Sequence, residues 1–252
     1  MLDWFRRLRK VTRKLALPSR DATSGRSGVQ LNPAKLTPSP DLYLARLSYL
    51  METASEVLSE QSHSAPAERL AKNQSELAVK YLNRSKTLDQ MLVKLGADSR
   101  QLKDSVAESV EQFHQYTLGR GWYENLIRLH IGYGILEDLY SRLSKGLSPA
   151  KRVQVETLLS DASLSKFAES TLIAAIKTQP QLAHQLALFA RAIVADVLLE
   201  VRNSVSLEKL TTSTSAVSKE DAAREAFKIL EPLTTELIAG HSQRMDALGL
   251  TA

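Results

Sequence analysis

The sequence feature that most constrains the fold is one apolar stripe in the middle of the chain. Large apolar and aromatic residues recur there at alternating steps of four and three: Trp122, Leu126, Leu129, Tyr133, Leu136, Tyr140 and Leu143. That spacing aligns side chains along one face of an α-helix. We therefore expect a single helix over 122–143 whose stripe packs in the core of a helical bundle.

Two polar residues lie at the edge of this stripe. His130 and Glu137 are seven residues apart, which is two helical turns, and Gly134 lies between them. A glycine at that position would let another backbone approach closely. A histidine and a carboxylate on the edge of a core helix suit two alternatives: a bundle that holds a metal, or a bundle whose polar side chains only bond one another.

Composition narrows the class of protein. The chain has 252 residues, of which 43% are hydrophobic, so it can bury a substantial core. It contains no cysteine, which excludes disulfides, zinc–thiolate sites, iron–sulfur clusters and thiol nucleophiles, and fits a reducing, cytoplasmic location. The most apolar run, 186–201, is interrupted by Arg191 and Asp196 and is shorter than the roughly 20 residues of a membrane span. We therefore expect no transmembrane helix.

The net charge of +5 is concentrated at the N-terminus. Residues 1–20 hold seven Lys or Arg and one acid, whereas the rest of the chain holds 26 basic and 27 acidic residues. A nearly neutral body gives no support for a broad nucleic-acid-binding face. The basic excess therefore indicates a role for the N-terminal segment alone.

Residues 1–17 are the first of three expected regions, a basic amphipathic segment. A helix of this type can lie on an anionic membrane surface, bind RNA or dock on a protein partner, and the first of these would place the chain at the inner face of the membrane. The alternative is that the segment is a disordered basic tail. The contact residues would be Trp4, Phe5, Arg6, Arg7, Arg9, Lys10, Arg13 and Lys14. Residues 18–40, rich in Ser, Pro, Gly and Thr, are expected to be a disordered linker, and residues 41–250 a helical domain.

The helical domain is expected to be all-α, with long antiparallel helices joined by short turns. Apolar spacing, prolines and glycines predict further helices at about 41–60, 66–95, 99–116, 149–178, 180–203, and after the polar stretch 211–218. The 149–178 helix should bend near Asp161–Ser165, and Pro232 should kink or divide the last helix. Because segment 180–203 is apolar almost all round, we expect it to be a central helix.

The Glu-x-x-His motifs of this sequence do not stand where a di-metal bundle needs its ligands. Such a bundle takes one Glu from each of two helices and Glu-x-x-His from the other two, all pointing inward. The two strings of this type, Glu60/His63 and Glu111/His114, both stand at expected helix ends. Neither is therefore well placed to reach the centre of the bundle.

Tyr81 and Arg84 stand in the middle of the apolar face of the helix predicted at 66–95. They indicate a polar centre of another kind than a di-metal site. Arginine stays protonated and cannot ligate a metal, and a buried guanidinium must pair with carboxylates to avoid a large desolvation cost. Our hypothesis is that Arg84 takes the place of a metal's charge, with no metal bound. The alternatives are that Arg84 reaches solvent with its stem packed, and that His130 and Glu137 hydrogen-bond within the bundle. The core polar cluster would comprise Tyr81, Arg84, His130, Glu137, Asp138, Asp161, Asp196 and Glu200.

Five strings, taken in order, resemble one protein family. They are LVKLGAD (92–98), FHQYTLGRGWYENLIRLHIGYGILEDLYSRLS (113–144), LLSDASLSKFAE (158–169), LALFARAIVADVLLEVR (186–202) and HSQRMDALGL (241–250). The chain from about residue 41 to 250 resembles the bacterial ferritin-like proteins grouped with the tRNA 2-methylthio-N6-isopentenyladenosine hydroxylases (MiaE-like). The resemblance implies a ferritin-like four-helix core with extra helices. In active relatives it also implies a non-haem di-iron centre and oxygen-dependent hydroxylation of a modified tRNA base.

Carried onto this sequence, the family's metal site lacks several ligands. The Glu-x-x-His of the second helix falls on Tyr81 and Arg84, and the later motif has Leu164 where a histidine would follow Asp161. If a metal is present, the resemblance leaves these acids to hold it: Glu137, Asp138, Asp161 and Asp196. The departure bears on the hydroxylase activity and leaves the expected fold unchanged.

The sequence supports three functional hypotheses. The first is a ferritin-like protein that has lost its metal site and acts as a structural or interaction module, with a homodimer as one arrangement. The second is a MiaE-like di-iron tRNA hydroxylase whose unusual ligands are drawn from those acids together with His130 and Glu200. The third is an RNA- or membrane-associated protein whose binding rests on residues 6–14.

Overall fold

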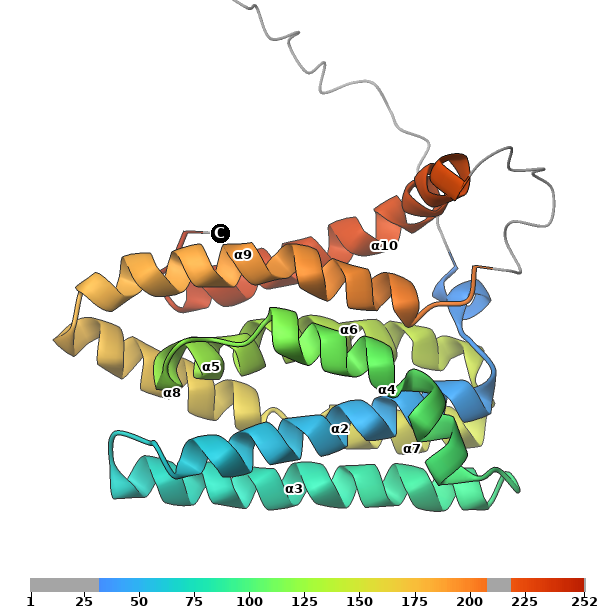
Figure 1. Cartoon of the computed structure of the whole chain (residues 1–252), viewed down its shortest axis with the longest axis horizontal. Coiled ribbons are helices and arrows are strands. Elements are labelled where there is room, and N and C mark those ends of the chain that lie inside the picture. Colours follow the sequence, from blue (N-terminus) through green and yellow to red (C-terminus); the bar gives the residue numbers. More distant parts are fainter. Residues whose placement is uncertain (1–31, 208–218, 252) are drawn as a thin grey trace, which may run out of the picture. The chain divides into compact units, whose positions relative to one another are not determined.

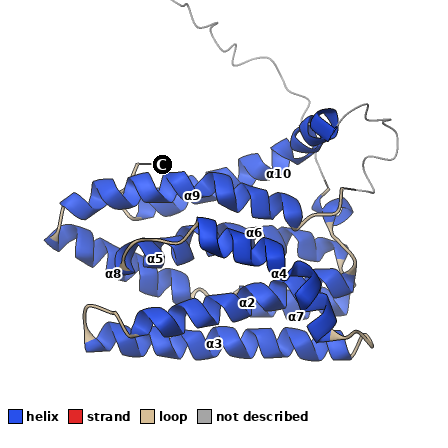
Figure 2. Cartoon of the chain, in the orientation of Figure 1, coloured by secondary structure: helices blue, strands red, loops and turns tan. Residues whose placement is uncertain are grey.

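The helix-forming sequence folds into long helices that run back and forth. The computed structural model describes residues 32–207 and 219–251, and in the second range the side chains from residue 229 onward. The elements are η1 (Pro33–Leu36), α2 (Pro40–Ser62), α3 (Glu68–Val93), α4 (Ser99–Tyr116), α5 (Trp122–Arg128), η2 (Leu129–Tyr133), α6 (Gly134–Leu143), η3 (Ser144–Gly146), α7 (Pro149–Leu159), α8 (Ser163–Thr178), α9 (Gln181–Asn203) and α10 (Lys219–Ala247). Figures 1 and 2 show these helices packed lengthwise, with no strand in the described ranges. The predicted all-α class is confirmed.

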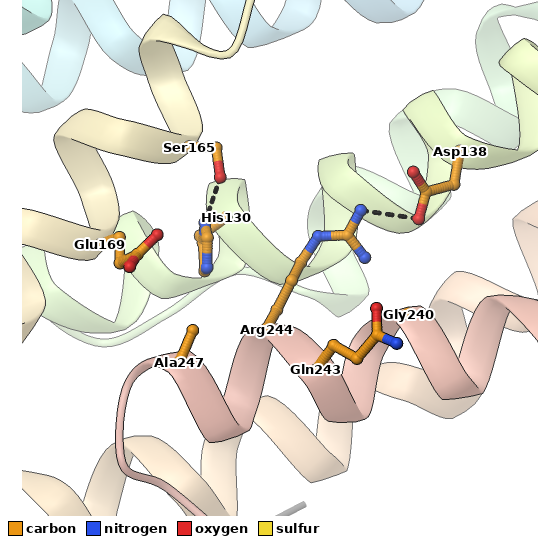
Figure 3. Close-up of a pocket in the computed structure, with 8 residues that line it drawn as sticks. All are labelled: His130, Asp138, Ser165, Glu169, Gly240, Gln243, Arg244 and Ala247. Carbon is orange, nitrogen blue, oxygen red and sulfur yellow. Dashed lines mark hydrogen bonds and ion pairs between the residues drawn. The ribbon is translucent and has the colours of Figure 1, made fainter.

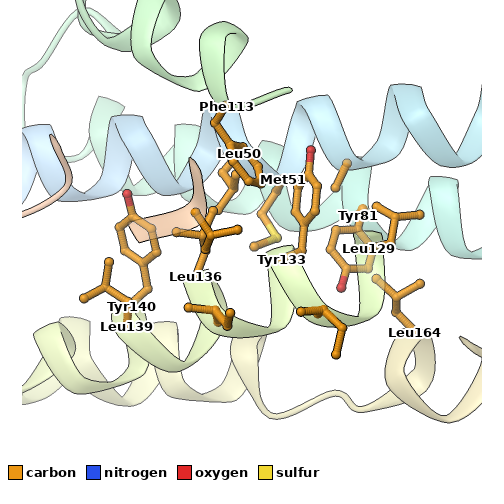
Figure 4. Close-up of a cluster of buried hydrophobic side chains, with 14 of the residues drawn as sticks. Leu50, Met51, Tyr81, Phe113, Leu129, Tyr133, Leu136, Leu139, Tyr140 and Leu164 are labelled. Atoms are coloured by element: carbon orange, nitrogen blue, oxygen red, sulfur yellow. The ribbon is translucent and has the colours of Figure 1, made fainter. Parts of the chain in front are cut away.

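The segment from Trp122 to Leu143 lies at the centre of this bundle. In Figure 1, α5 and α6 run between α2 on one side and α9 on the other. The stripe residues from Leu126 onward are buried, and so are Ile127, Ile131 and Leu139 on its other faces. Figure 4 shows side chains of this segment meeting residues of α2, α3 and α4. The prediction of a core helix is confirmed, although the segment is buried nearly all round and not along one stripe.

The central segment differs from the single regular α-helix that the sequence predicted. Leu129–Tyr133 form a π-helical segment, η2, between α5 and α6. A π turn bonds residue i to residue i+5, so it inserts one extra residue and rotates the next part of the helix by about 100°. His130 and Glu137 therefore face different neighbours: His130 meets Ser165 of α8, and Glu137 meets Tyr81 of α3.

Helix ends agree with local sequence signals. Asp98 caps α4 by accepting hydrogen bonds from the backbone N–H groups of Arg100 and Gln101. Gly96 adopts a φ of 73° just after α3, the left-handed conformation that ends many helices. The predicted 149–178 helix divides into α7 and α8 just before the expected bend, and α10 continues through Pro232. The polar stretch 211–218 lies outside the described residues.

The end of the predicted linker is part of the fold, which corrects the expectation for residues 32–40. Pro33–Leu36 form a 3-10 helix, and Leu36 is fully buried. The Thr37 hydroxyl donates to the backbone carbonyl of Leu143 over 2.7 Å, so this segment fastens the end of α6. The sequence did not reveal this because one leucine in a proline-rich stretch has no periodicity. Residues 1–31, including the predicted basic segment, lie outside the described residues.

The prediction that segment 180–203 would be a central helix is wrong. One face of α9 buries Ile193, Val197 and Val201, whereas Leu188 and Leu199 are 63% and 49% exposed. Within the described residues, α9 is long and apolar enough to cross a membrane by length and composition alone, a property that core helices of soluble proteins share. An apolar composition all round does not say which face of a helix the fold covers.

The central position of α6 can be tested by truncating one of its fully buried side chains. We expect Leu136→Ala to lower the free energy of unfolding by about 2–5 kcal/mol, because it leaves a cavity in the core. The control is Val79→Ala on α3, where the side chain is 57% exposed and the effect should stay within about 0.5 kcal/mol. Urea unfolding followed by circular dichroism measures both, and equal effects would contradict the arrangement.

Candidate functional site

Arg84 lies where α3, α6 and the turn before α8 meet. Its side chain is only 7% exposed, so it does not reach solvent as one alternative supposed. The Nη2 atom lies 2.9 Å from Asp161 Oδ2, and Nη1 lies 3.6 Å from Glu137 Oε1. The guanidinium also packs over the Tyr81 ring, with Cζ 4.5 Å from the ring centroid. Arg84 is thus an inward-facing cation held by two carboxylates and an aromatic face.

The two carboxylates around Arg84 differ in their surroundings. Glu137 accepts a 2.8 Å hydrogen bond from the Tyr81 hydroxyl, and burial raises the pKa of both groups. For Asp161, which is 42% exposed, burial acts in the same direction, but hydrogen bonds from Ser163 and the guanidinium of Arg84 lower its pKa overall. The outer carboxylate therefore stays ionised readily, while the inner one holds a proton more tightly than an ordinary glutamate.

The structure divides the rest of the predicted polar cluster, which corrects the expectation of a single site. Asp138 pairs with Arg244 of α10, with Oδ2 2.7 Å from Nη2. Glu200 of α9 pairs with Arg46 of α2 over 2.8 Å. Asp196 makes neither contact, and His130 faces a separate pocket. The acids that were expected to converge are thus shared among three arginines from α2, α3 and α10.

The two Glu-x-x-His strings do not meet at the centre of the bundle. Glu60 and His63 are exposed at the end of α2, and Glu111 is exposed on α4. His114, half-buried, lies against Arg128, whose Nη1 donates to the His114 carbonyl over 3.1 Å. Burial and the charge of Arg128 lower the pKa of His114 to about 4.

Arg128 is a second buried arginine, and sequence reasoning missed it. It is fully buried, yet its Nε and Nη2 atoms have no acceptor among the described residues. Burial lowers its pKa. The residue stands between two stripe positions of the central segment, where an arginine would ordinarily reach solvent, so its position in the sequence gave no sign of burial.

A polar pocket of about 280 Å³ lies between η2, α6, α8 and α10 (Figure 3). Figure 3 shows the Arg244 side chain extending from α10 between His130 and Asp138. The lining residues are His130, Asp138, Ser165, Glu169, Gly240, Gln243, Arg244 and Ala247. Sequence reasoning missed Arg244, Glu169 and Gln243 as site residues, because Arg244 and Gln243 stand in a polar run, 241–244, that gave no sign of a site.

Two glycines make room for Arg244 beside the pocket. A Cβ atom on Gly134 would lie 2.8 Å from Arg244 Nε, and one on Gly240 would lie 3.1 Å from Asp138 Oδ2. Arg244 Nη2 also donates to the Gly134 carbonyl over 3.0 Å. Gly134 therefore admits a guanidinium, where the sequence suggested the approach of another backbone.

His130 forms the inner wall of the pocket. It is 3% exposed, its Nδ1 lies 3.4 Å from Ser165 Oγ, and its Nε2 has no partner among the described residues. Burial, together with the nearby charge of Arg244, lowers the pKa of His130 to about 4. The imidazole is therefore neutral at neutral pH and has one ring nitrogen left to bond.

These helices, with polar groups paired between them, define a helical-bundle protein of the type that builds sites between facing helices. Residues 39–218 match the family described as "Ferritin-like domain, actinomycetes", and the chain belongs to this family. The match confirms the ferritin-like fold that the sequence indicated. No curated protein is similar to the chain at a significant level.

Replacing each of the two buried arginines by methionine should have different effects on the free energy of unfolding. Arg84→Met leaves Glu137 without its cation and should lower the free energy of unfolding by about 2–4 kcal/mol, allowing for the exposure of Asp161. Arg128→Met removes a charge that makes no ion pair with the described residues, and should stay within about 1 kcal/mol of the unchanged protein or stabilise it. Urea unfolding compares them. A loss for Arg128→Met as large as that for Arg84→Met would show that its guanidinium has an acceptor.

The lowered pKa of His130 predicts loss of stability in acid. The unfolded chain binds a proton near pH 6.5 and the folded chain only near pH 4, so between these values acid favours unfolding. We expect protonation of His130 alone to lower the free energy of unfolding by about 1.5 kcal/mol between pH 6.5 and pH 5. His130→Gln should flatten the stability profile over that range, whereas His184→Gln on the exposed face of α9 should not. If His130→Gln left the pH dependence of the free energy of unfolding unchanged, the lowered pKa of His130 would be contradicted.

Proposed function

We propose that this chain is a ferritin-like protein in which a salt-bridged arginine replaces a di-iron centre, and that it acts as a structural or interaction module. The observation that carries this proposal is the position of Arg84 between Glu137 and Asp161. In the resemblance to the MiaE-like family, Arg84 stands where the second helix of an active enzyme would present a ligand histidine.

The side chains at this centre do not fit a metal ion. Glu137 Oε1 already accepts a hydrogen bond from Tyr81 and faces Nη1 of Arg84, and Asp161 Oδ2 lies against Nη2. A fixed guanidinium repels a second cation at the same oxygens and cannot serve as a ligand. Of the remaining acids of the predicted metal set, Asp138 is held by Arg244, and Asp196 makes no ion pair with the described residues.

A structural or interaction role is supported by the surface of α9. Its outward face presents exposed Leu188 and Leu199 along a helix that the sequence makes apolar nearly all round. We infer that this face, which the described residues leave uncovered, contacts another molecule, because leucines three helical turns apart lie on the same side of a helix. The basic segment 1–17 stays a separate prediction of contact with a membrane, RNA or a protein partner.

Metal analysis tests the proposal directly. Protein produced with iron supplied should contain iron far below stoichiometric amounts, and adding ferrous iron should cause no oxygen consumption above that of buffer. Stoichiometric iron with an oxo-bridged di-iron spectrum would overturn the proposal and favour the alternative, a MiaE-like tRNA hydroxylase.

A histidine variant tests whether the charge of Arg84 excludes a metal ion. Arg84→His removes the fixed cation and puts an imidazole beside Glu137 and Asp161, a ligand set that suits a transition metal. We expect this variant to bind Co²⁺ with a visible d–d absorption band that the unchanged protein lacks. Equal cobalt binding by both proteins would contradict the claim that the charge of Arg84 excludes metal.

A further inference from the structure

The pocket between η2, α8 and α10 has bonding groups that its own walls do not satisfy. Arg244 uses Nη2 for Asp138 and the Gly134 carbonyl, while its buried Nη1 has no acceptor among the described residues. The buried Nε2 of His130 also lacks a partner there. Buried polar atoms in native proteins are nearly always bonded, so these two nitrogens call for a ligand or solvent molecule in the pocket.

Glu169 places a carboxylate on the opposite side of the pocket from Arg244. It comes from α8, is only partly buried, and makes no hydrogen bond or ion pair with the described residues. In Figure 3 it lies on the far side of His130 from Arg244. The pocket thus places a free carboxylate at one end and a guanidinium with a spare nitrogen at the other.

The balance of charge in the pocket selects among ligand classes. Arg244 is largely offset by Asp138, and Glu169 adds a further negative charge beside the imidazole of His130. A simple anion would meet two carboxylates, and a simple cation would leave Arg244 Nη1 without an acceptor. A molecule carrying both charges satisfies both ends of the pocket.

We propose that this pocket binds a small zwitterion with an ammonium and a carboxylate group, the chemical class of the α-amino acids. The ligand carboxylate accepts from Arg244 Nη1 and from the imidazole of His130, and the ammonium donates to Glu169. The volume of about 280 Å³ lies just below the range of pockets for drug-sized ligands, which suits a molecule of this size. The pocket uses none of the atoms that hold Arg84, so this inference stands apart from the metal question.

Titration followed by NMR tests the proposal on the full chain. Each standard α-amino acid is added separately, at about 10 mM, to ¹⁵N-labelled protein, a concentration that reveals even millimolar affinity. At least one should shift backbone resonances of 129–133, 163–170 and 240–247 in a saturable manner. Saturable shifts by none of them, or shifts confined to other parts of the chain, would overturn the proposal.

Matched analogues of the tightest amino acid separate the two charges. The deaminated acid keeps the carboxylate and the decarboxylated amine keeps the ammonium, so each should bind at least tenfold more weakly than the parent. If the deaminated acid bound as well as the parent, the site would be an anion site and the proposal would fail.

A variant at the rim of the pocket completes the test. Glu169→Gln preserves size, and because Glu169 makes no hydrogen bond or ion pair with the described residues the fold should be retained. It should weaken binding of the amino acid about tenfold, whereas binding of the deaminated acid should not weaken, because that anion no longer meets a second carboxylate. The matched control is Glu68→Gln on the exposed start of α3, which should alter neither affinity. Unchanged amino-acid binding by Glu169→Gln would contradict the role of that carboxylate.

Discussion

Among the described residues, three inward carboxylates around the central segment are each held by an arginine from another helix. Glu137 meets Arg84, Asp138 meets Arg244, and Glu200 meets Arg46. A buried carboxylate without such a partner costs several kcal/mol, and removing one partner of a buried pair is more damaging than lacking the pair altogether. Each pair also joins two elements that are far apart in the sequence, namely α3 with α6, α10 with α6, and α2 with α9. Neutralising these charges therefore also fixes how the outer helices sit around the central segment.

The π segment decides which acid meets which arginine. Without it, His130 and Glu137 would lie two turns apart on one face, as in a regular helix. The extra residue of η2 rotates them apart, so that Glu137 faces α3 while His130 faces α8 and α10. One irregular turn thus produces two polar sites on opposite sides of the same segment: a closed one filled by Arg84 and an open one lined by His130 and Arg244.

Much of the fold could be predicted from sequence because it depends on local periodicity. The all-α class, the core position of segment 122–143 and the bounds of α4 rest on apolar spacing, an aspartate cap and glycine stops. The sequence offered two positions for Arg84, inward or reaching solvent, and the structure has the inward one. Its partners Glu137 and Asp161 were among the predicted acids, but the sequence could not separate them from Asp138, Asp196 and Glu200, since a π turn has no clear sequence signal and rotates the acids after it. The pocket was missed for a related reason: His130, Glu169 and Arg244 come from three elements, and only packing brings them together.

The proposal that Arg84 takes the place of a metal rests on the size of the electrostatic repulsion between a guanidinium and a metal ion. Two unit charges 4 Å apart in a protein interior repel by about 4 kcal/mol, so a divalent ion placed beside the guanidinium would face about twice that. A metal could bind only by expelling Arg84, whose side chain is 7% exposed and is held by Asp161, Glu137 and the Tyr81 ring. Expulsion would break these contacts. In the proposed function, the ferritin-like fold is kept without the ligand set because the arginine supplies the positive charge that Glu137 and Asp161 require.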